Sequence, residues 1–387
     1  MNSHHRSIGL VFAVHGMVAG SMSTRIPWIQ DQLDLGPGTL GLALLCPSIG
    51  AFLAMPTASR LAHRFGTRAT SRLLIALWCA GVLLPALSPA PGWLFAAFLL
   101  YGAAAGMSDV VMNAHGVVVE KHLGRPIISG LHGMWAVGSL AGGGLGVLAA
   151  QFGLDARLHL AAVSVVMLGV GVLAGRGLLA DGPAGAHVPA PRRFALPTRA
   201  IAAIGVVGFC GTFAEGASAN WAAVYVTEVA SAGPGMAAAT YTIFMLFMAS
   251  TRLAGDRIVQ RFGPVTVVRL SGATAAIGAL LVVVARTPAL AIAGFSLLGL
   301  GVAVVVPLVF AAAGRTGATP GEGVAGVATI TYLSGLTAPA ITGWAAGAFS
   351  YPAAFTLVAV ILVAMSALAG ALRPKPAPAQ TPEPALR

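Results

Sequence analysis

One stretch of sequence occurs twice in this chain and decides the fold. Residues 59–76 read SRLAHRFGTRATSRLLIA, and residues 256–273 read DRIVQRFGPVTVVRLSGA. A shift of 197 residues superposes them on the pattern R-x-x-x-R-F-G-x-x-x-x-x-R and places Gly66 over Gly263. Because arginine is scarce in this chain, the shared arginines indicate an internal repeat.

The composition is that of a membrane protein. Of 387 residues, 57% are hydrophobic and 9% are charged, whereas about 25% of the residues of a soluble domain are charged. A membrane-spanning helix needs about 20 apolar residues, and the strict alternation of a lipid-facing β-barrel is absent. Twelve apolar runs of suitable length occur, at 8–26, 38–58, 70–88, 92–118, 127–151, 157–176, 200–226, 235–253, 268–285, 288–312, 323–348 and 352–372. We therefore predict an all-α membrane protein with twelve transmembrane helices.

Lysine and arginine are distributed unevenly between alternate loops. With the N-terminus inside, 19 of them, Arg252 included, fall on the cytoplasmic side, against Arg25, Arg157 and Arg286 on the other. Such an excess marks the cytoplasmic loops of a membrane protein. We expect a multi-pass protein of the bacterial inner (plasma) membrane with both termini in the cytoplasm. The net charge of +11 then reflects topology, and no nucleic-acid partner is expected.

The repeat and the spans together predict the domain organisation. Six spans separate matching residues, so the two copies keep the same orientation across the membrane, as parallel repeats. We predict an N-terminal six-helix bundle over 1–176, a cytoplasmic linker over 177–199, a C-terminal six-helix bundle over 200–372 and a disordered Pro-rich cytoplasmic tail over 373–387. Four prolines exclude a continuous helix in the linker.

Parallel six-helix repeats and the repeated loop resemble the major facilitator superfamily of transporters, over essentially the whole chain. The loop SRLAHRFGTR is similar to the family signature G-x-x-x-D-R-x-G-R-R, in which arginines and a carboxylate bridge helix ends and bias the transporter between inward-open and outward-open states. Arg64, Gly66 and Arg68 match this signature, whereas Ser59 and His63 replace its glycine and aspartate.

The second copy of the loop offers the carboxylate that the first copy lacks. Asp256 lies close in sequence to Arg257 and Arg261 and could serve either one. The resemblance thus implies a cytoplasmic gate, with the residues Arg64, Gly66, Arg68, Asp256, Arg257 and Arg261. The alternative is that these arginines only set the topology.

The fourth predicted span contains an aspartate in an apolar run. Small and polar residues recur there at helical spacing, namely Gly102, Gly106, Asp109, Asn113, Gly116 and Glu120. Such a stripe faces protein or water instead of lipid. Since a carboxyl group in a low-dielectric cavity binds a proton more readily than in water, we expect Asp109 to be the proton-linked site. A structural hydrogen bond between helices is the alternative.

Two further spans carry candidate residues. Glu215, in the seventh span, is the second carboxylate that we place well inside the membrane. An ion pair with Arg25 or with a histidine is its structural alternative. We predict a substrate- and proton-binding site made of Asp109, Asn113, Glu215, Asn220, Trp221, His132, Trp135 and Arg25.

A narrower resemblance lies in the segment SDVVMNA. It is similar to the pattern E-T-A-A-N-P of the fucose–proton symporter branch, with Asp109 and Asn113 on the carboxylate and asparagine positions. The phrases GLHGMWAVG and EGASANWAAVYV resemble an uncharacterised bacterial inner-membrane group in that branch. The resemblance implies proton-coupled sugar or polyol uptake, although the first span lacks that symporter's second carboxylate. The glycines of GSLAGGGLGV approach an antiporter motif instead, which leaves proton-antiport export of small amphipathic compounds open.

The sequence therefore predicts a monomeric, proton-coupled secondary active transporter of a small solute that works by alternating access in the lipid bilayer. A channel or a non-transporting membrane protein is the alternative from another class. Neither an H-E-x-x-H motif nor paired cysteines occur, so we expect no enzyme activity, catalytic residue, metal or other cofactor. Pro307 and Pro339 are candidate hinges in the tenth and eleventh spans.

Overall fold

The computed structural model describes residues 3–124, 127–180, 198–314, 316 and 320–373, without the side chains of a few residues inside helices. The N-terminal half contains α1 Ser3–Ser23, α2 Ile26–Gln32, α3 Pro37–Phe65, α4 Thr67–Gly81, η1 Pro85–Leu87, α5 Pro91–Leu123, α6 Ile128–Gln151 and α7 Ala156–Arg176. The C-terminal half contains α8 Arg199–Ala230, α9 Pro234–Phe262, α10 Pro264–Val284, α11 Pro288–Val302, α12 Val305–Gly314, α13 Pro320–Ala348, α14 Tyr351–Leu368 and η2 Ala369–Leu372. The expected linker lies largely, and the tail almost wholly, outside the described residues.

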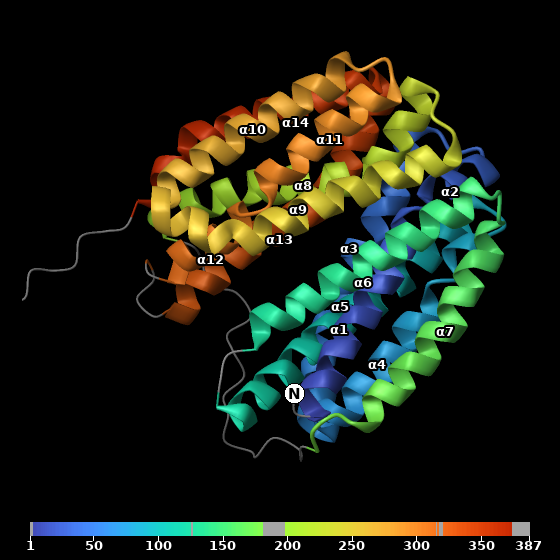
Figure 1. Ribbon diagram of the computed structural model, residues 1–387, viewed down its shortest axis with the longest axis vertical. Coiled ribbons are helices and arrows are strands. Elements are labelled where there is room, and N and C mark those ends of the chain that lie inside the picture. The colour runs from blue at the N-terminus through green and yellow to red at the C-terminus, as the bar shows by residue number, and fades with distance from the viewer. Residues whose placement is uncertain (1–2, 125–126, 181–197, 315, 317–319, 374–387) are drawn as a thin grey trace, which may run out of the picture.

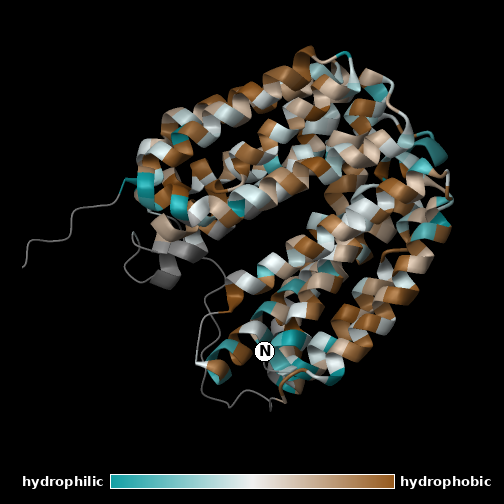
Figure 2. Ribbon diagram, in the orientation of Figure 1, coloured by the Kyte–Doolittle hydropathy of each residue, from teal (hydrophilic) through white to brown (hydrophobic). Residues whose placement is uncertain are grey.

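The helices form a membrane-spanning fold. Ten segments of the described chain are long and apolar enough to cross a membrane, and α1 with α2 makes an eleventh span, bent by 41°. The long helix α13 completes the twelve-helix fold, in which α11 and α12 together form one span. Figure 2 shows apolar residues along the lengths of the helices and hydrophilic residues gathered toward their ends. The prediction of an all-α membrane protein is confirmed.

The helix boundaries reproduce the internal repeat. The bounds of α9 are those of α3 shifted by 197 residues, and the starts of α10 and α11 match those of α4 and α5 in the same way. Gly66 and Gly263 form the matching corners, with φ of 82° and 73°. A residue with a side chain rarely adopts such a φ, so these glycines are required at the corners.

The two halves touch mainly through two helix pairs, α3 with α13 and α6 with α9. Figure 1 shows two bundles that converge at the end where α2 lies and diverge toward the end where α12 and the N-terminus lie. Near the converging end, the Gln30 amide donates to Glu228 (Nε2 to Oε1, 3.4 Å), and a Cβ on Gly41 would lie 2.9 Å from Gly343 Cα. The halves are thus closed together at one end.

Two prolines alter the hydrogen bonding of their helices in different ways. Proline has no N–H for the carbonyl four residues earlier. Pro307 leaves the Ala303 carbonyl without this partner, and the tenth span breaks there, between α11 and α12. Pro339 lies inside a continuous α13, and the carbonyl it frees, that of Gly335, accepts a hydrogen bond from Ser48 Oγ of the other half at 2.8 Å. Only Pro307 coincides with an interrupted helix.

Candidate functional site

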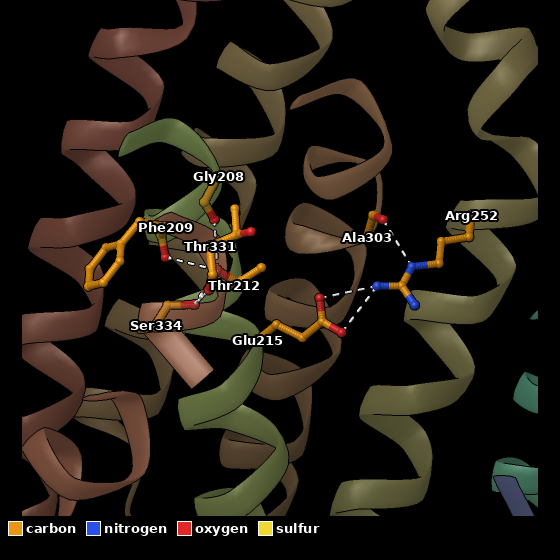
Figure 3. Close-up of polar contacts among 8 residues, drawn as sticks. All are labelled: Gly208, Phe209, Thr212, Glu215, Arg252, Ala303, Thr331 and Ser334. Carbon is orange, nitrogen blue, oxygen red and sulfur yellow. Dashed lines mark hydrogen bonds and ion pairs between the residues drawn. The ribbon is translucent and has the colours of Figure 1, made fainter. Parts of the chain in front are cut away.

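The C-terminal half holds an ion pair near the middle of its helices. Glu215 on α8 lies with both carboxylate oxygens 3.1 Å from Arg252 Nη2 on α9, as Figure 3 shows. It is the one ion pair found within the described residues. Both side chains keep partial exposure, 35% for Arg252 and 26% for Glu215. The pair is therefore accessible and not sealed in the core.

Arg252 lies farther from the end of its helix than the sequence predicts. The expected eighth span ends at residue 253, with Arg252 counted among the cytoplasmic arginines, whereas α9 continues to Phe262. Arg252 therefore lies ten residues inside the helix end, about 15 Å along the axis at 1.5 Å per residue. Arg252 lies inside the segment 234–255, which is long and apolar enough to cross a membrane, and the side on which the basic loops lie stays a prediction.

Arg252 is anchored by the helix break at Pro307. Its Nε donates to the Ala303 carbonyl at 3.1 Å, the oxygen that loses its helical partner because Pro307 has no N–H. Figure 3 shows the guanidinium reaching from α9 between this carbonyl and Glu215. The break thus supplies an acceptor that orients the arginine toward the carboxylate.

A hydroxyl network lies one turn before Glu215 on α8. Thr212 Oγ1 lies within hydrogen-bond distance of the Gly208 carbonyl of its own helix, at 2.8 Å, and of Ser334 Oγ on α13, and its one proton serves one of these two acceptors at a time. Ser334 in turn donates to the Thr331 carbonyl at 2.6 Å. This network, visible in Figure 3, joins α8 to α13 next to the ion pair.

The N-terminal half holds Asp109 without a cation. Asn113 Nδ2 donates to Asp109 Oδ1 at 3.2 Å and to the Asp109 carbonyl at 2.9 Å, so its amide partner comes from the same helix. Within the described residues no ion pair involves Asp109. The rings of His15 on α1 and His132 on α6 lie within electrostatic range of its carboxylate. Two imidazoles from other helices therefore interact electrostatically with this acid.

His15 is a site residue that the sequence interpretation left out. Trp135 Nε1 donates to His15 Nδ1 at 3.1 Å, and His15 Nε2 lies 3.3 Å from the Ala105 carbonyl. Since Nδ1 accepts a hydrogen bond, the proton of the neutral ring is assigned to Nε2. Trp78 stacks on the ring at 4.8 Å and donates its Nε1 proton to the His15 carbonyl at 3.2 Å. The predicted residue Trp135 thus holds a buried histidine in one tautomer.

His132 and Tyr241 connect the two acidic sites across the halves. His132 interacts electrostatically with Asp109 and also with Arg252. Tyr241 on α9 lies beside the hydroxyls of Ser23 and Ser139 and within electrostatic range of Glu215. Asp109, His132, Arg252 and Glu215 are therefore linked by one ion pair and by electrostatic interactions of His132, and we call these four residues the central polar cluster.

Three predicted site residues lie in other surroundings. Asn220 donates to the Gly216 carbonyl of its own helix at 2.8 Å. Trp221 is fully buried, with its ring 6.0 Å from that of Tyr351 on α14. Arg25, 3% exposed, donates to the Leu154 carbonyl and interacts with Asp155. No contact in the described structure joins these three residues to the central polar cluster.

The expected gate residues of the first copy occupy helix ends. Arg64 lies over the Phe65 ring at 5.2 Å, and Arg68 donates to the Arg176 carbonyl at the end of α7 at 3.2 Å. A carbonyl thus takes the place of the signature's missing carboxylate.

The second copy repeats part of this arrangement. Arg261 lies over the Phe262 ring at 5.5 Å, as Arg64 does over Phe65, and Arg257 is exposed. The side chain of Asp256 lies outside the described part of the structure. Its role as carboxylate partner stays a prediction.

The glycines that approach an antiporter motif serve helix packing. A Cβ on Gly138 would lie 2.0 Å from the Ala13 carbonyl oxygen, and one on Gly142 would lie 2.2 Å from that of Met17. Gly143 meets Thr242 of the other half in the same way, at 2.7 Å. Close approach of α6 to α1 and α9 therefore accounts for this spacing.

Comparison with known sequences identifies related proteins. The family model of the Major Facilitator Superfamily matches residues 8–318 and, in a second match, residues 204–387. An uncharacterised MFS-type transporter of Yersinia pestis is 34% identical over 378 residues, which cover 96% of each chain.

Comparison with solved structures shows the same fold in transporters of distant sequence. The nucleoside transporter NupG superposes with a TM-score of 0.75 at 12% identity, covering 95% of this chain and 98% of that one. The fucose:proton symporter of E. coli superposes with a TM-score of 0.64 at 16% identity, covering 94% and 97%.

Proposed function

The chain belongs to the major facilitator superfamily, and on that premise we propose that this membrane transporter couples the uptake of a small polar solute to protons. The observation that carries the proposal is Asp109, which lies near the middle of α5, has no ion-pair partner in the described structure, and is within electrostatic range of His15 and His132. A carboxylate inside a membrane protein is costly, and a bound proton removes its charge. Asp109 is thus suited to exchange a proton with water between the halves.

The arrangement of the halves supports alternating access. The halves meet at the end that holds Gln30 and Glu228, and the opposite end carries the repeated basic loops. Because basic loops face the cytoplasm, we assign the closed end to the outside and the conformation to the inward-open state. Both termini are then cytoplasmic.

Uptake is favoured over export by two features. The glycines of the antiporter-like segment are accounted for by packing. Asp109 and Asn113 keep the spacing of the symporter pattern, and Asn113 donates to Asp109. The substrate class that this symporter pattern implies is a hydroxylated solute such as a sugar or polyol.

Transport by purified protein tests the proposal. A thermal-shift screen of sugars, polyols, amino acids and lipophilic cations selects the solute, and its uptake is measured in proteoliposomes with and without a pH gradient. Asp109→Asn should abolish gradient-driven accumulation while leaving counterflow exchange, since exchange needs no net proton movement. Asp34→Asn is the matched control, because Asp34 is exposed and has a φ of 50° that asparagine tolerates.

The outcomes separate the hypotheses. If Asp109→Asn retains accumulation with unchanged pH dependence, the assignment of the proton to Asp109 is wrong. If the wild type shows no trans-stimulated exchange, a carrier mechanism is excluded in favour of a channel.

A further inference from the structure

Arg252 has one hydrogen-bonding edge left over. A guanidinium carries five N–H donors. In Arg252, Nε is used by the Ala303 carbonyl and Nη2 by the two oxygens of Glu215. Nη1 meets no acceptor within the described residues, and the side chain is 35% exposed. Figure 3 shows Nη1 pointing away from both Ala303 and Glu215. The edge formed by Nη1 and Nη2 is therefore open to a further acceptor.

The ion pair is not in the geometry that binds a carboxylate most strongly. Both oxygens of Glu215 share Nη2, at 3.1 Å each, whereas the stronger arrangement places one oxygen on each of two nitrogens. A carboxylate that approached the open edge could take Nη1 and Nη2 together. Because the Nε bond to Ala303 holds the guanidinium plane, a competing ligand would find this edge already oriented.

A second basic group lies within electrostatic range of Arg252 in the other half. His132 on α6 is an exposed side chain within electrostatic range of Arg252. Besides Arg252, the groups that face its ring are Asp109 and Phe12, whose ring lies 5.5 Å away. An anion between Arg252 and His132 would contact both halves, because α6 and α9 pack across the interface.

From this geometry we infer that Arg252 and His132 form the binding site for the carboxylate group of an organic-acid substrate, and that Glu215 is the counterion which this group displaces. The inference rests on the transport function proposed above and narrows its substrate to a small hydroxylated organic acid. The permanent charge of arginine suits this role, since the site stays cationic at any physiological pH.

Charge balance then gives Glu215 a proton. Two carboxylates beside one guanidinium leave a net negative charge in a low-dielectric site, which is unfavourable. A proton from water between the halves, taken by Glu215 as the substrate carboxylate binds Arg252, restores neutrality. The ionisable groups that interact with Glu215 are Arg252 and Tyr241. One turn earlier on α8, Thr212 shares a hydrogen bond with Ser334 of α13. One proton therefore accompanies each bound carboxylate.

Paired acids and amides test this site. Thermal shift of the purified full-length protein is measured with gluconate against gluconamide, lactate against lactamide and benzoate against benzamide, on either side of neutral pH. In the wild type at least one acid should stabilise the protein more than its amide, and this preference should weaken as pH rises, because Glu215 must be protonated for the acid to bind.

Three variants separate binding from folding. Glu215→Gln removes the competing carboxylate, so the same acid should bind about 10-fold more tightly at alkaline pH, without pH dependence over the range tested. The double variant Glu215→Gln with Arg252→Gln has no uncompensated charge at the pair and should lose the acid response. Arg286→Gln, a change of an exposed arginine whose guanidinium donates to the nearby carbonyls of Val283 and Ala285, should behave as the wild type.

Other results would overturn the inference. These are equal responses to acids and amides, no response to any probe in either wild type or Glu215→Gln, or an acid response that survives in the double variant. Failure of this kind leaves the transport proposal standing if Asp109→Asn still loses gradient-driven accumulation. The proposal of proton-coupled transport is wrong instead if the Asp109→Asn variant accumulates solute normally.

Discussion

The two halves share one helix arrangement but hold their carboxylates differently. Glu215 pairs with Arg252 from a neighbouring helix, whereas Asp109 receives only an amide from its own helix within the described structure. The 197-residue shift places Val306 over Asp109 and Val18 over Glu215, so neither acid is part of the repeated scaffold. The difference shows that a repeated fold carries two unlike sites: one carboxylate is compensated by a permanent cation, and the other has no ion-pair partner within the described structure.

Removal of the cation from the compensated site should give a large loss of stability. In Arg252→Gln, Glu215 keeps its charge without a partner. A lone buried charge costs about 3–5 kcal/mol, and partial exposure of this pair reduces the expected loss to about 2 kcal/mol. Asn113→Ala in the other half should cost less, about 1 kcal/mol, because only an amide donor is lost. Thermal unfolding in detergent measures both.

A neutralised pair checks the origin of that loss. Addition of Glu215→Gln to Arg252→Gln should restore most of the lost stability, because no uncompensated charge remains. An equally unstable double variant would show that Arg252 stabilises the protein through packing and its bond to Ala303, and the contrast between the two carboxylate sites would disappear.

The glycines beside the two acids offer the next test. A Cβ on Gly102 would lie 1.9 Å from the Pro47 carbonyl oxygen, which is backbone, whereas one on Gly208 would meet side-chain atoms of Thr331 and Val309 at 2.6 and 2.8 Å. We expect Gly102→Ala to cost about 1–3 kcal/mol and Gly208→Ala to cost less, since side chains adjust more readily than backbone.

The matched control for this pair is Gly169→Ala, where nothing lies within 4 Å of the added Cβ. It should leave the unfolding temperature unchanged or raise it slightly, since alanine favours helix by up to about 1 kcal/mol. Equal losses at Gly102 and Gly208 would contradict the tighter packing that we assign to the Asp109 helix.

The smallest effect should come from the bond between the halves at Pro339. Ser48→Ala removes the hydroxyl that donates to the Gly335 carbonyl. The free energy that holds the two halves together should fall by about 1 kcal/mol. Crosslinking or spectroscopic distances between cytoplasmic helix ends should then report a smaller inward-open population. Ser250→Ala is the control, because that hydroxyl donates to its own helix, at Leu246. If the two variants behave alike, the hydrogen bond of Ser48 does not stabilise the contact between the halves at the closed end.

Much of the fold could be predicted from local patterns. The repeated loop predicts matching helix ends, and Gly66 and Gly263 form matching corners with positive φ. The stripe around Asp109 predicts a protein-facing side, and Gly102 and Gly106 do pack against α3. These features are local because helical spacing places residues three and four apart on one face.

The partners of the acids could not be predicted in the same way. Arg252 lies one residue before the end of the expected span and was therefore counted with the cytoplasmic loops. One feature of the sequence indicates that a donor from another helix lies near Ala303. Pro307 leaves the Ala303 carbonyl without its helical partner, and such a carbonyl inside a membrane needs another hydrogen-bond donor. His15, in an apolar run of the first span, carried the general signal of an ionisable residue inside the membrane.

The sequence by itself determined the all-α membrane fold, the two parallel repeats and the presence of two intramembrane carboxylates, since hydropathy, repeated motifs and helical spacing are properties of continuous segments. Only the tertiary structure decided which group meets each acid. Glu215 and Arg252 lie 37 residues apart, and Trp135 lies 120 residues from His15. Such contacts depend on how each helix is rotated and tilted against its neighbours, which packing of the whole bundle sets.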